Sequence, residues 1–231
     1  MARLAILIAT ALLVASPAGA SNAVSLGYSG ETTIVGPERE CSVGTLFHNH
    51  DGSFENGYAW RYGGCQPPYF GAFGEGYDLG TGTAACGAFW LTTIMLYYPI
   101  SSDCYVWEGG TESAPGAVLG VVADVWFESV PSWPTVAQND IEMNIAVTGP
   151  FTIGCWGNWP GAGNAYFVAA DENGPGGHPW TCIAPGQDYP SGWQNPAIVW
   201  PNAKSMGCGV YFEQGTPVES ESWGSIKAFY R

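Results

Sequence analysis

Short runs of apolar and aromatic residues recur along the chain, separated by clusters of glycine, proline, asparagine and aspartate. Runs of this length bounded by turn-forming residues are typical of β-strands. The pattern predicts strands at residues 23–29, 56–62, 86–98, 104–110, 117–128, 140–147, 151–158, 165–172, 197–202 and 207–213. Short strands at this spacing favour an all-β fold, an antiparallel β-sandwich with a jelly-roll-like arrangement.

Two of these runs differ in the spacing of their apolar residues. Ile141, Met143, Ile145 and Val147 alternate with polar or small residues, so we expect one face of this strand to point into the core. The run from Cys86 to Tyr98 is apolar at nearly every position, which predicts a strand buried on both faces.

The two ends of the chain differ from the strand-rich middle. Residues 1–20 contain one arginine, a short apolar run and a small-residue ending, which is the layout of a secretory signal peptide. Residues 21–213 are expected to form the sandwich as one domain, and residues 214–231 a linker and tail. The tail has Trp223, Ile226, Phe229 and Tyr230 at helical spacing. This predicts a short C-terminal helix, which either docks on the sandwich or serves as a recognition tag for export or attachment.

Composition supports β structure and restricts the partners. The chain has 33 glycines and 17 prolines, and charged residues make up 11% of it, well below the usual quarter. The formal net charge is −14, so we exclude nucleic acid and anionic lipid headgroups as partners. No second run reaches transmembrane length, and no membrane insertion is expected after signal cleavage. We expect a protein that is secreted, held at the cell surface or periplasmic.

Seven cysteines, all after the predicted signal peptide, favour disulfide bonds in an exported protein. Their odd number leaves at least one thiol unpaired. Their wide spacing, without a C-x-x-C pair, argues against zinc and thioredoxin-like sites.

Two polar segments contain residue types that bind metals. His48 and His50 lie close to Asp51, but further ligands are lacking and we favour a turn before a strand. Asp171, Glu172 and Asn173 precede a glycine-rich turn and offer the oxygen ligands that calcium prefers. An Asx turn explains the same residues equally well. Calcium is therefore the one candidate cofactor.

The chain lacks familiar catalytic motifs. It has no G-x-S-x-G, S-x-x-K or H-E-x-x-H motif and no assignable pair of carboxylates. The Cys155–Trp156 step is similar to that of papain-like proteases, but the preceding residues differ and a disulfide is the simpler state of Cys155. We predict that the protein is not an enzyme. A Cys155–His178 contact, or a cleft with paired carboxylates, would indicate a hydrolase instead.

The eleven tryptophans offer a different chemistry. Trp90 and Trp107 lie inside predicted strands and are expected to be core residues. Elsewhere, indole rings with amides nearby suit sugar binding, because the rings stack on apolar sugar faces and the amides bond hydroxyls. Trp180 and Trp193 are expected on loops. The candidate ligand-binding residues are Trp156, Trp159, Trp180 and Trp193. Their alternative role is to pack the sheets together.

Several sequence blocks carry a resemblance to known proteins. They are NHDGSFENGYAW, GYDLG with CGAFWL, YVWEGG with PGAVL, GCWGNWPG and YFVAADENGPGG. Through them, residues 47–212 resemble a group of secreted β-sandwich proteins from bacterial metagenomes, in which an aspartate is usual at the position of Glu108. The ending SWGSIKAFYR is similar to short C-terminal endings of secreted proteins from such bacteria. The resemblance implies that residues 48–64 are a module signature, and it transfers no catalytic residue.

These observations predict a secreted, non-catalytic binding module with carbohydrate as the favoured ligand class. Two alternatives stay open. One is a structural component of the cell envelope or extracellular matrix, with every tryptophan in the core. The other is a secreted hydrolase. Sugar binding requires at least two of the four candidate tryptophans to be exposed near one another.

Overall fold

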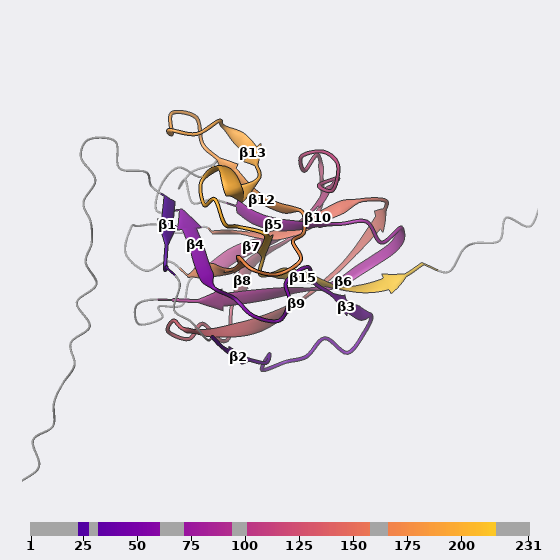
Figure 1. The fold of residues 1–231 in the computed structure, drawn as a ribbon. Coiled ribbons are helices and arrows are strands. Elements are labelled where there is room, and N and C mark those ends of the chain that lie inside the picture. The colour runs from indigo at the N-terminus through magenta and orange to yellow at the C-terminus, as the bar shows by residue number, and fades with distance from the viewer. Residues whose placement is uncertain (1–22, 28–31, 61–71, 94–100, 158–165, 216–231) are drawn as a thin grey trace, which may run out of the picture.

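The computed structural model describes residues 23–27, 32–60, 72–93, 101–157 and 166–215. Within these ranges the chain forms fifteen β-strands and one 3-10 helix, η1 (Pro196–Ile198), without an α-helix. The strands build two mostly antiparallel sheets with a hydrophobic core between them (Figure 1). The predicted all-β class and two-sheet arrangement are confirmed, and the finer jelly-roll-like connectivity stays a prediction.

The larger sheet has nine strands, with β6 at its centre. The strands are β1 (Ala23–Ser25), β2 (Thr33–Val35), β3 (Thr45–Phe47), β4 (Asn56–Trp60), β6 (Thr81–Thr92), β9 (Thr135–Thr148), β11 (Phe167–Asp171), β14 (Ser205–Met206) and β15 (Cys208–Gln214). Strand β6 pairs with β9 along one edge and with β15 and β11 along the other. All pairs in this sheet are antiparallel except β2 with β9.

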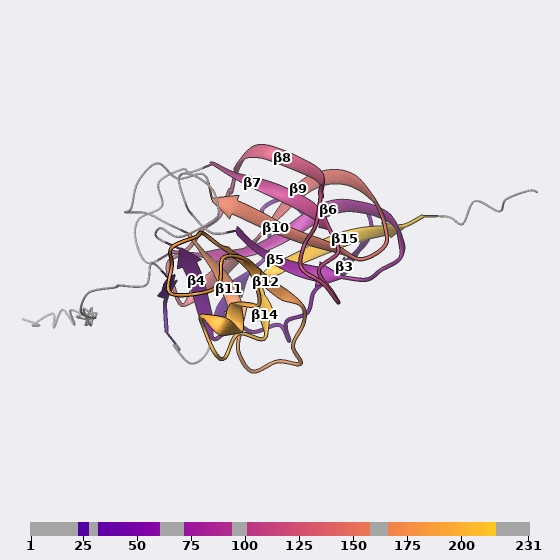
Figure 2. The same cartoon turned by 90° about the horizontal axis from the view of Figure 1, so that it is seen from above.

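The smaller sheet has six antiparallel strands. They are β5 (Ala72–Tyr77), β7 (Ser101–Glu108), β8 (Val118–Trp126), β10 (Phe151–Gly157), β12 (Pro179–Ile183) and β13 (Gly192–Gln194). Their order is β13-β12-β5-β10-β7-β8, so β13 and β8 are the edge strands. Both views place β1 and β4 at one end of the molecule, and β3 and the end of β15 at the other (Figure 2).

Alternation along the strands fills the main core. On β10, Phe151, Ile153 and Cys155 point inward, and Tyr58 and Trp60 of β4 share the inward face of the opposite sheet. Burial of each large apolar side chain of this kind contributes roughly 1.5–3 kcal/mol. The residues between them on β10 face away from the core, which positions the site described below.

A disulfide ties the segment between β2 and β3 to the larger sheet. Strand β2 pairs with β9 and β3 pairs with β15, so the intervening chain crosses the sheet on the face away from the core. Cys41 in this segment is bonded to Cys86 of β6. The bond confirms that the protein forms a disulfide and is compatible with an extracellular location.

All but one of the predicted strands correspond to strands in the described residues. Residues 141–147 alternate as expected, and β6 is buried on both faces from Ala84 to Thr92. The strand predicted at 197–202 is wrong. Asn195 instead caps η1, accepting a hydrogen bond from the Ala197 N–H at 2.8 Å, and Pro196 begins the turn.

The predicted signal peptide (1–20) and the C-terminal helical tail, from residue 216 on, lie outside the described residues. In the part of the chain that the structure describes, no helix has the length and apolar character needed to cross a bilayer.

Candidate functional site

The outer face of the six-stranded sheet carries a layer of aromatic side chains. The neighbouring residues of β7 point into the core, so Tyr105 and Trp107 point outward. Their rings are stacked with centroids 4.9 Å apart. The Trp156 ring of β10 lies 5.9 Å from Tyr105, and the Trp193 ring of β13 lies 5.0 Å from Trp107. We call Tyr105, Trp107, Trp156 and Trp193 the aromatic layer.

Small residues allow Trp107 and Trp193 to meet across the sheet. Three strands separate β7 from β13, so their backbones are roughly 19 Å apart at about 4.8 Å per strand. The outward positions between them include Gly154, which pairs with Gly74, and Ala72. Without bulky side chains at these positions, both indoles can lie over the middle of the sheet.

Exposure differs within the aromatic layer. Trp107 is 3% exposed, whereas Tyr105, Trp156 and Trp193 are half-buried. Trp107 therefore supports the layer from beneath, and the other three rings keep surface that a ligand can contact. Packing on strands and on a buried indole holds these rings in place before any ligand binds.

Trp180 of β12 flanks the aromatic layer. It is half-buried and pairs in register with Gly74. Its indole N–H donates a hydrogen bond to the Gly110 carbonyl at 2.7 Å. The loop that contains Gly110 is itself held by Thr152, whose hydroxyl donates to the Gly109 carbonyl at 3.0 Å. The orientation of Trp180 is therefore fixed by the loop after β7.

A carboxylate lies beside these rings. Asp103 of β7 pairs in register with Trp156. Its Oδ1 accepts a hydrogen bond from the Asp124 N–H at 3.0 Å, and its Oδ2 lies 3.4 Å from the Tyr105 hydroxyl. Burial, followed by the charge of Asp103, raises the pKa of Tyr105, so this hydroxyl remains a donor at neutral pH.

The structure brings together two of the four predicted tryptophans. Trp156 and Trp193 are linked through the aromatic layer, and Trp180 lies beside them. The prediction that Trp180 and Trp193 lie on loops is wrong, because both are on short strands. Trp159 lies outside the described residues.

Tyr105 was not predicted as a site residue, and Trp107 was predicted to be a core residue. Trp107 is buried as expected, but on the outer face of its sheet rather than between the sheets. Alternation with the small or aliphatic residues Cys104 and Val106 is the signal that separates the two faces. It was masked because every residue from Cys104 to Trp107 is compatible with burial.

The candidate calcium ligands take part in a buried hydrogen-bond network. Asp171 is fully buried. Its Oδ1 accepts from the backbone N–H groups of Asn173 (2.9 Å) and Gly174 (2.6 Å), and its Oδ2 accepts from the Asp51 N–H (3.0 Å). This is the Asx turn that the sequence offered as the alternative to a calcium site, and the network joins the 48–56 and 171–178 segments.

The neighbouring carboxylates of Glu172 and Glu55 also accept hydrogen bonds from this part of the chain. Glu172 Oε1 accepts from Asn56 Nδ2 at 2.9 Å and from the Tyr58 hydroxyl. Asn173 Nδ2 donates to Glu55 Oε1 at 3.0 Å. Among the described residues no group of three or more His, Cys, Asp or Glu side chains is arranged to hold a metal ion. A calcium ion at Asp171, Glu172 and Asn173 would have to displace these bonds, and it stays a prediction.

The two histidines of the module signature pack on the outer face of the larger sheet. Their rings stack with centroids 4.1 Å apart, and His50 also contacts Phe54 and Trp90. Burial, and then the nearby His48, lower the pKa of His50 to about 3. Gly52 N–H donates to His50 Nδ1 at 3.1 Å, and Nε2 has no hydrogen-bond partner in the described part of the chain. His50 is therefore a neutral packing residue at physiological pH.

Glu75 of β5 is a buried carboxylate that joins distant segments. It is 0% exposed and accepts hydrogen bonds from Asn49 Nδ2 (2.8 Å), the His178 N–H (2.5 Å) and the Met206 N–H (2.8 Å). Burial raises its pKa to about 8, although these hydrogen bonds act in the opposite direction. The arrangement gives Glu75 a structural role.

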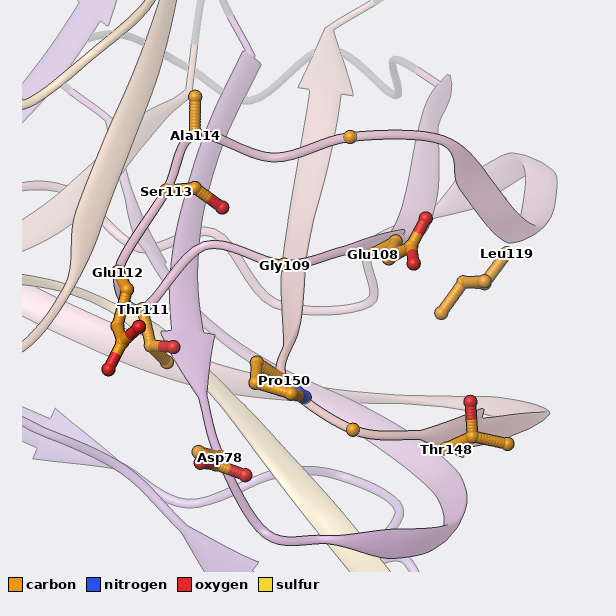
Figure 3. A pocket seen from close by; sticks show the side chains of 12 residues that line it. Asp78, Glu108, Gly109, Thr111, Glu112, Ser113, Ala114, Leu119, Thr148 and Pro150 are labelled. Carbon is orange, nitrogen blue, oxygen red and sulfur yellow. The ribbon is translucent and has the colours of Figure 1, made fainter.

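A cleft of about 640 Å³ lies where the turns β5–β6, β7–β8 and β9–β10 meet. Glu108 and Leu119 lie on one side of it, and Thr111 and Glu112 on the other (Figure 3). Asp78 is its third carboxylate, and no aromatic side chain among the residues that the structure describes lines it. Because the cleft offers no surface for ring stacking, the aromatic layer is the better candidate for a sugar site.

The buried cysteines do not form a nucleophilic site. Cys155 lies in the core and is a free thiol, like Cys104 and Cys208, so the expected disulfide at Cys155 is wrong. Burial raises the pKa of Cys104 and Cys208, which keeps these thiols protonated and weakly nucleophilic. His178 packs beside Gly76 on the outer side of the sheet, away from Cys155.

The chain matches no protein-family model, no curated protein and no solved structure. The resemblance to secreted metagenomic proteins therefore stays a prediction, and the function has to be inferred from this chain's own residues.

Proposed function

We propose that this protein is a secreted, non-catalytic carbohydrate-binding module of jelly-roll-like connectivity, and that the aromatic layer is its ligand-binding face. One observation carries the proposal. Trp156 and Trp193 are half-buried on one sheet face and are joined by ring contacts through Tyr105 and Trp107. Aromatic rings offer sugars large apolar contact areas, while Tyr and Trp retain polar groups for hydroxyls.

The construction of the face supports the proposal. Antiparallel sheets commonly present polar side chains on a solvated face, and here that face has indole and phenol rings. Because these rings are held on strands, they lose less conformational entropy on ligand binding than rings on a flexible loop would. Aromatic rings that keep part of their surface accessible and are held in this way are typical of interaction sites.

A purely structural role is the competing interpretation. It requires all the tryptophans to be buried like Trp60 and Trp200, which are 1% and 7% exposed. The residual exposure of Trp156 and Trp193 favours binding over that role. The predicted signal peptide and the Cys41–Cys86 disulfide are both compatible with action outside the cell.

Alanine substitution in the aromatic layer tests the proposal. Residues 21–231 should bind at least one member of an immobilised glycan panel, and isothermal titration should then give the affinity for that glycan. Trp156→Ala and Trp193→Ala should each weaken binding about tenfold, equivalent to about 1.4 kcal/mol, because each removes a stacking ring.

Trp133→Ala is the matched control, because Trp133 is partly buried against the other sheet. Its affinity should equal that of the parent chain. Silence across the whole panel would contradict the proposal. Loss of folding in Trp156→Ala and Trp193→Ala would assign these residues to a structural role.

A further inference from the structure

Asp103 is well placed to orient a ligand on the aromatic layer. It lies on the outward face of β7, two residues before Tyr105 and opposite Trp156 in the β7–β10 register. A ligand that contacts both rings would therefore pass the Asp103 carboxylate. Polar groups of this kind fix the orientation of ligands that bind mainly through apolar contact.

A β-bulge holds the carboxylate in position. Ala123 and Asp124 of β8 together face Asp103, because the β7–β8 register shifts between Ser102 and Cys104. Asp124 has a φ of 54°, and its N–H donates to Asp103 Oδ1 at 3.0 Å. The contact from Oδ2 to the Tyr105 hydroxyl, at 3.4 Å, is long for an O–H···O hydrogen bond. Oδ2 therefore keeps the capacity to accept a hydrogen bond from a ligand hydroxyl.

The charges around the aromatic layer disfavour an acidic ligand. The formal net charge of the chain is −14. In the described part of the chain the lysine and arginine residues are Arg39 and Lys204. Arg39 pairs with Glu128, and Lys204 Nζ contacts the Asn173 carbonyl. Neither compensates Asp103, so a carboxylated or sulfated sugar placed there would be repelled.

The width of the face suits a chain of several sugars. Val121, Tyr105, Gly154, Gly74 and Trp180 form one row across five strands, which spans roughly 19 Å at about 4.8 Å per strand. At one end of this row Val121 is 47% exposed, and Val118, opposite Trp107, is 52% exposed. The apolar surface thus continues to the edge of the sheet.

We infer that the ligand is a neutral polysaccharide, and that Asp103 is the specificity-determining residue that accepts its hydroxyl hydrogen bonds and rejects acidic sugars. The inference rests on the proposed function and adds the chemical class of the ligand.

Matched neutral and acidic polymers test the inference. Affinity electrophoresis of residues 21–231 would compare hydroxyethylcellulose with carboxymethylcellulose, and methyl-esterified polygalacturonate with polygalacturonate. The neutral member of at least one pair should retard the protein, and its acidic partner should retard it at least tenfold less. Asp103→Asn should weaken binding of the neutral polymer about tenfold, because it replaces a charged acceptor. It should also reduce the difference in affinity between the neutral and the acidic polymer.

Glu108→Gln is the control, since it removes the same charge from the same strand, at a side chain that lines the cleft of about 640 Å³ and not the aromatic layer. It should leave both affinities unchanged. Asp103→Asn keeps an oxygen for the Asp124 N–H, and its melting temperature reports whether the bulge survives. If the variant is unstable, the parent chain still tests the inference, because 1 M salt should reduce the discrimination within each pair.

Three outcomes separate this inference from the proposed function. Equal or tighter binding of the acidic polymer overturns the inference. The inference is also overturned if Trp156→Ala weakens binding of the neutral polymer but Asp103→Asn leaves it unchanged. In that case the proposed function stands. No retardation by any of the four polymers, together with silence across the glycan panel, contradicts both.

Discussion

Two buried ionisable side chains make the stability of this fold depend on pH, and their two contributions have opposite signs. Glu75 has its pKa raised from 4.5 to about 8 by burial, and His50 has its pKa lowered from 6.5 to about 3 mainly by burial. In both cases the folded protein favours the neutral form. Each side chain therefore lowers stability in the pH range where its unfolded form is charged and its folded form is not.

The signs follow from proton binding. Between pH 4.5 and 8 folded Glu75 keeps a proton that the unfolded chain has lost, so the free energy of unfolding falls as pH rises, by up to about 1.4 kcal/mol per pH unit. Between pH 6.5 and 3 the unfolded chain protonates His50 and the folded chain does not, so the free energy of unfolding falls as pH falls. Denaturant unfolding from pH 3.5 to 8.5 measures both slopes.

Relative to the parent chain, Glu75→Gln should lose the alkaline slope and His50→Asn the acid slope. Glu75→Gln also carries a pH-independent cost, since its amide nitrogen replaces an accepting oxygen, so the slope and not the absolute stability is the readout. Asparagine at position 50 can still accept from the Gly52 N–H. Curves that remain parallel to the parent's at every pH would show that neither side chain is perturbed.

At the scale of elements, the close approach of β5 and β10 depends on glycine. A Cβ on Gly154 would lie 2.1 Å from the Phe73 carbonyl oxygen. Gly154→Ala should therefore destabilise the fold by roughly 2–3 kcal/mol, because the backbone of two paired strands must shift. Gly149→Ala is the control, since a Cβ there meets nothing within 4 Å. An equal decrease in the melting temperature of both variants would contradict this explanation.

Edge strand β8 is apolar yet irregular. Val118, Leu119, Val121 and Trp126 are all exposed on it, which on a regular edge strand would invite pairing with another chain. The β7–β8 register shifts twice, near Asp103 and between Val106 and Trp107. Bulges of this kind twist an edge and interrupt its ladder. The one that protects the edge near Asp124 also orients the Asp103 carboxylate.

Sequence patterns predicted regular elements and missed glycine-rich ones. The alternation of Ile141 to Val147 correctly predicted part of β9. Strand β5 was missed because Gly74, Glu75 and Gly76 have low strand propensity. Its glycines are needed because neighbouring segments approach them too closely for a side chain. The Glu75 carboxylate accepts hydrogen bonds from donors 26, 103 and 131 positions away in the sequence. No local window of sequence contains these partners.

At the scale of the whole molecule, the sequence predicted the all-β fold class and singled out Trp156 and Trp193, which the structure brings into one group of aromatic rings, but it did not predict how they are joined. Their contact runs through Tyr105 and Trp107, and it depends on a strand order that brings residues 72–77 between β10 and β12. Strand order is a long-range property. The faces of β7 were equally hard to distinguish, because both sides of that strand are buried to some degree.

The central claim is that a polysaccharide covers the aromatic layer. The most direct measurement is oxidation of exposed indoles by N-bromosuccinimide, with and without the tightest-binding member of the glycan panel, followed by peptide mass spectrometry. Trp126 of β8, which is 56% exposed and lines a separate cleft with Arg39 and Glu128, serves as an internal reference. We predict that the glycan slows oxidation of Trp156 and Trp193 several-fold and leaves Trp126 unchanged. Unchanged oxidation of Trp156 and Trp193 at saturating glycan, or protection of Trp126 alone, would contradict the assignment of this face as the binding site.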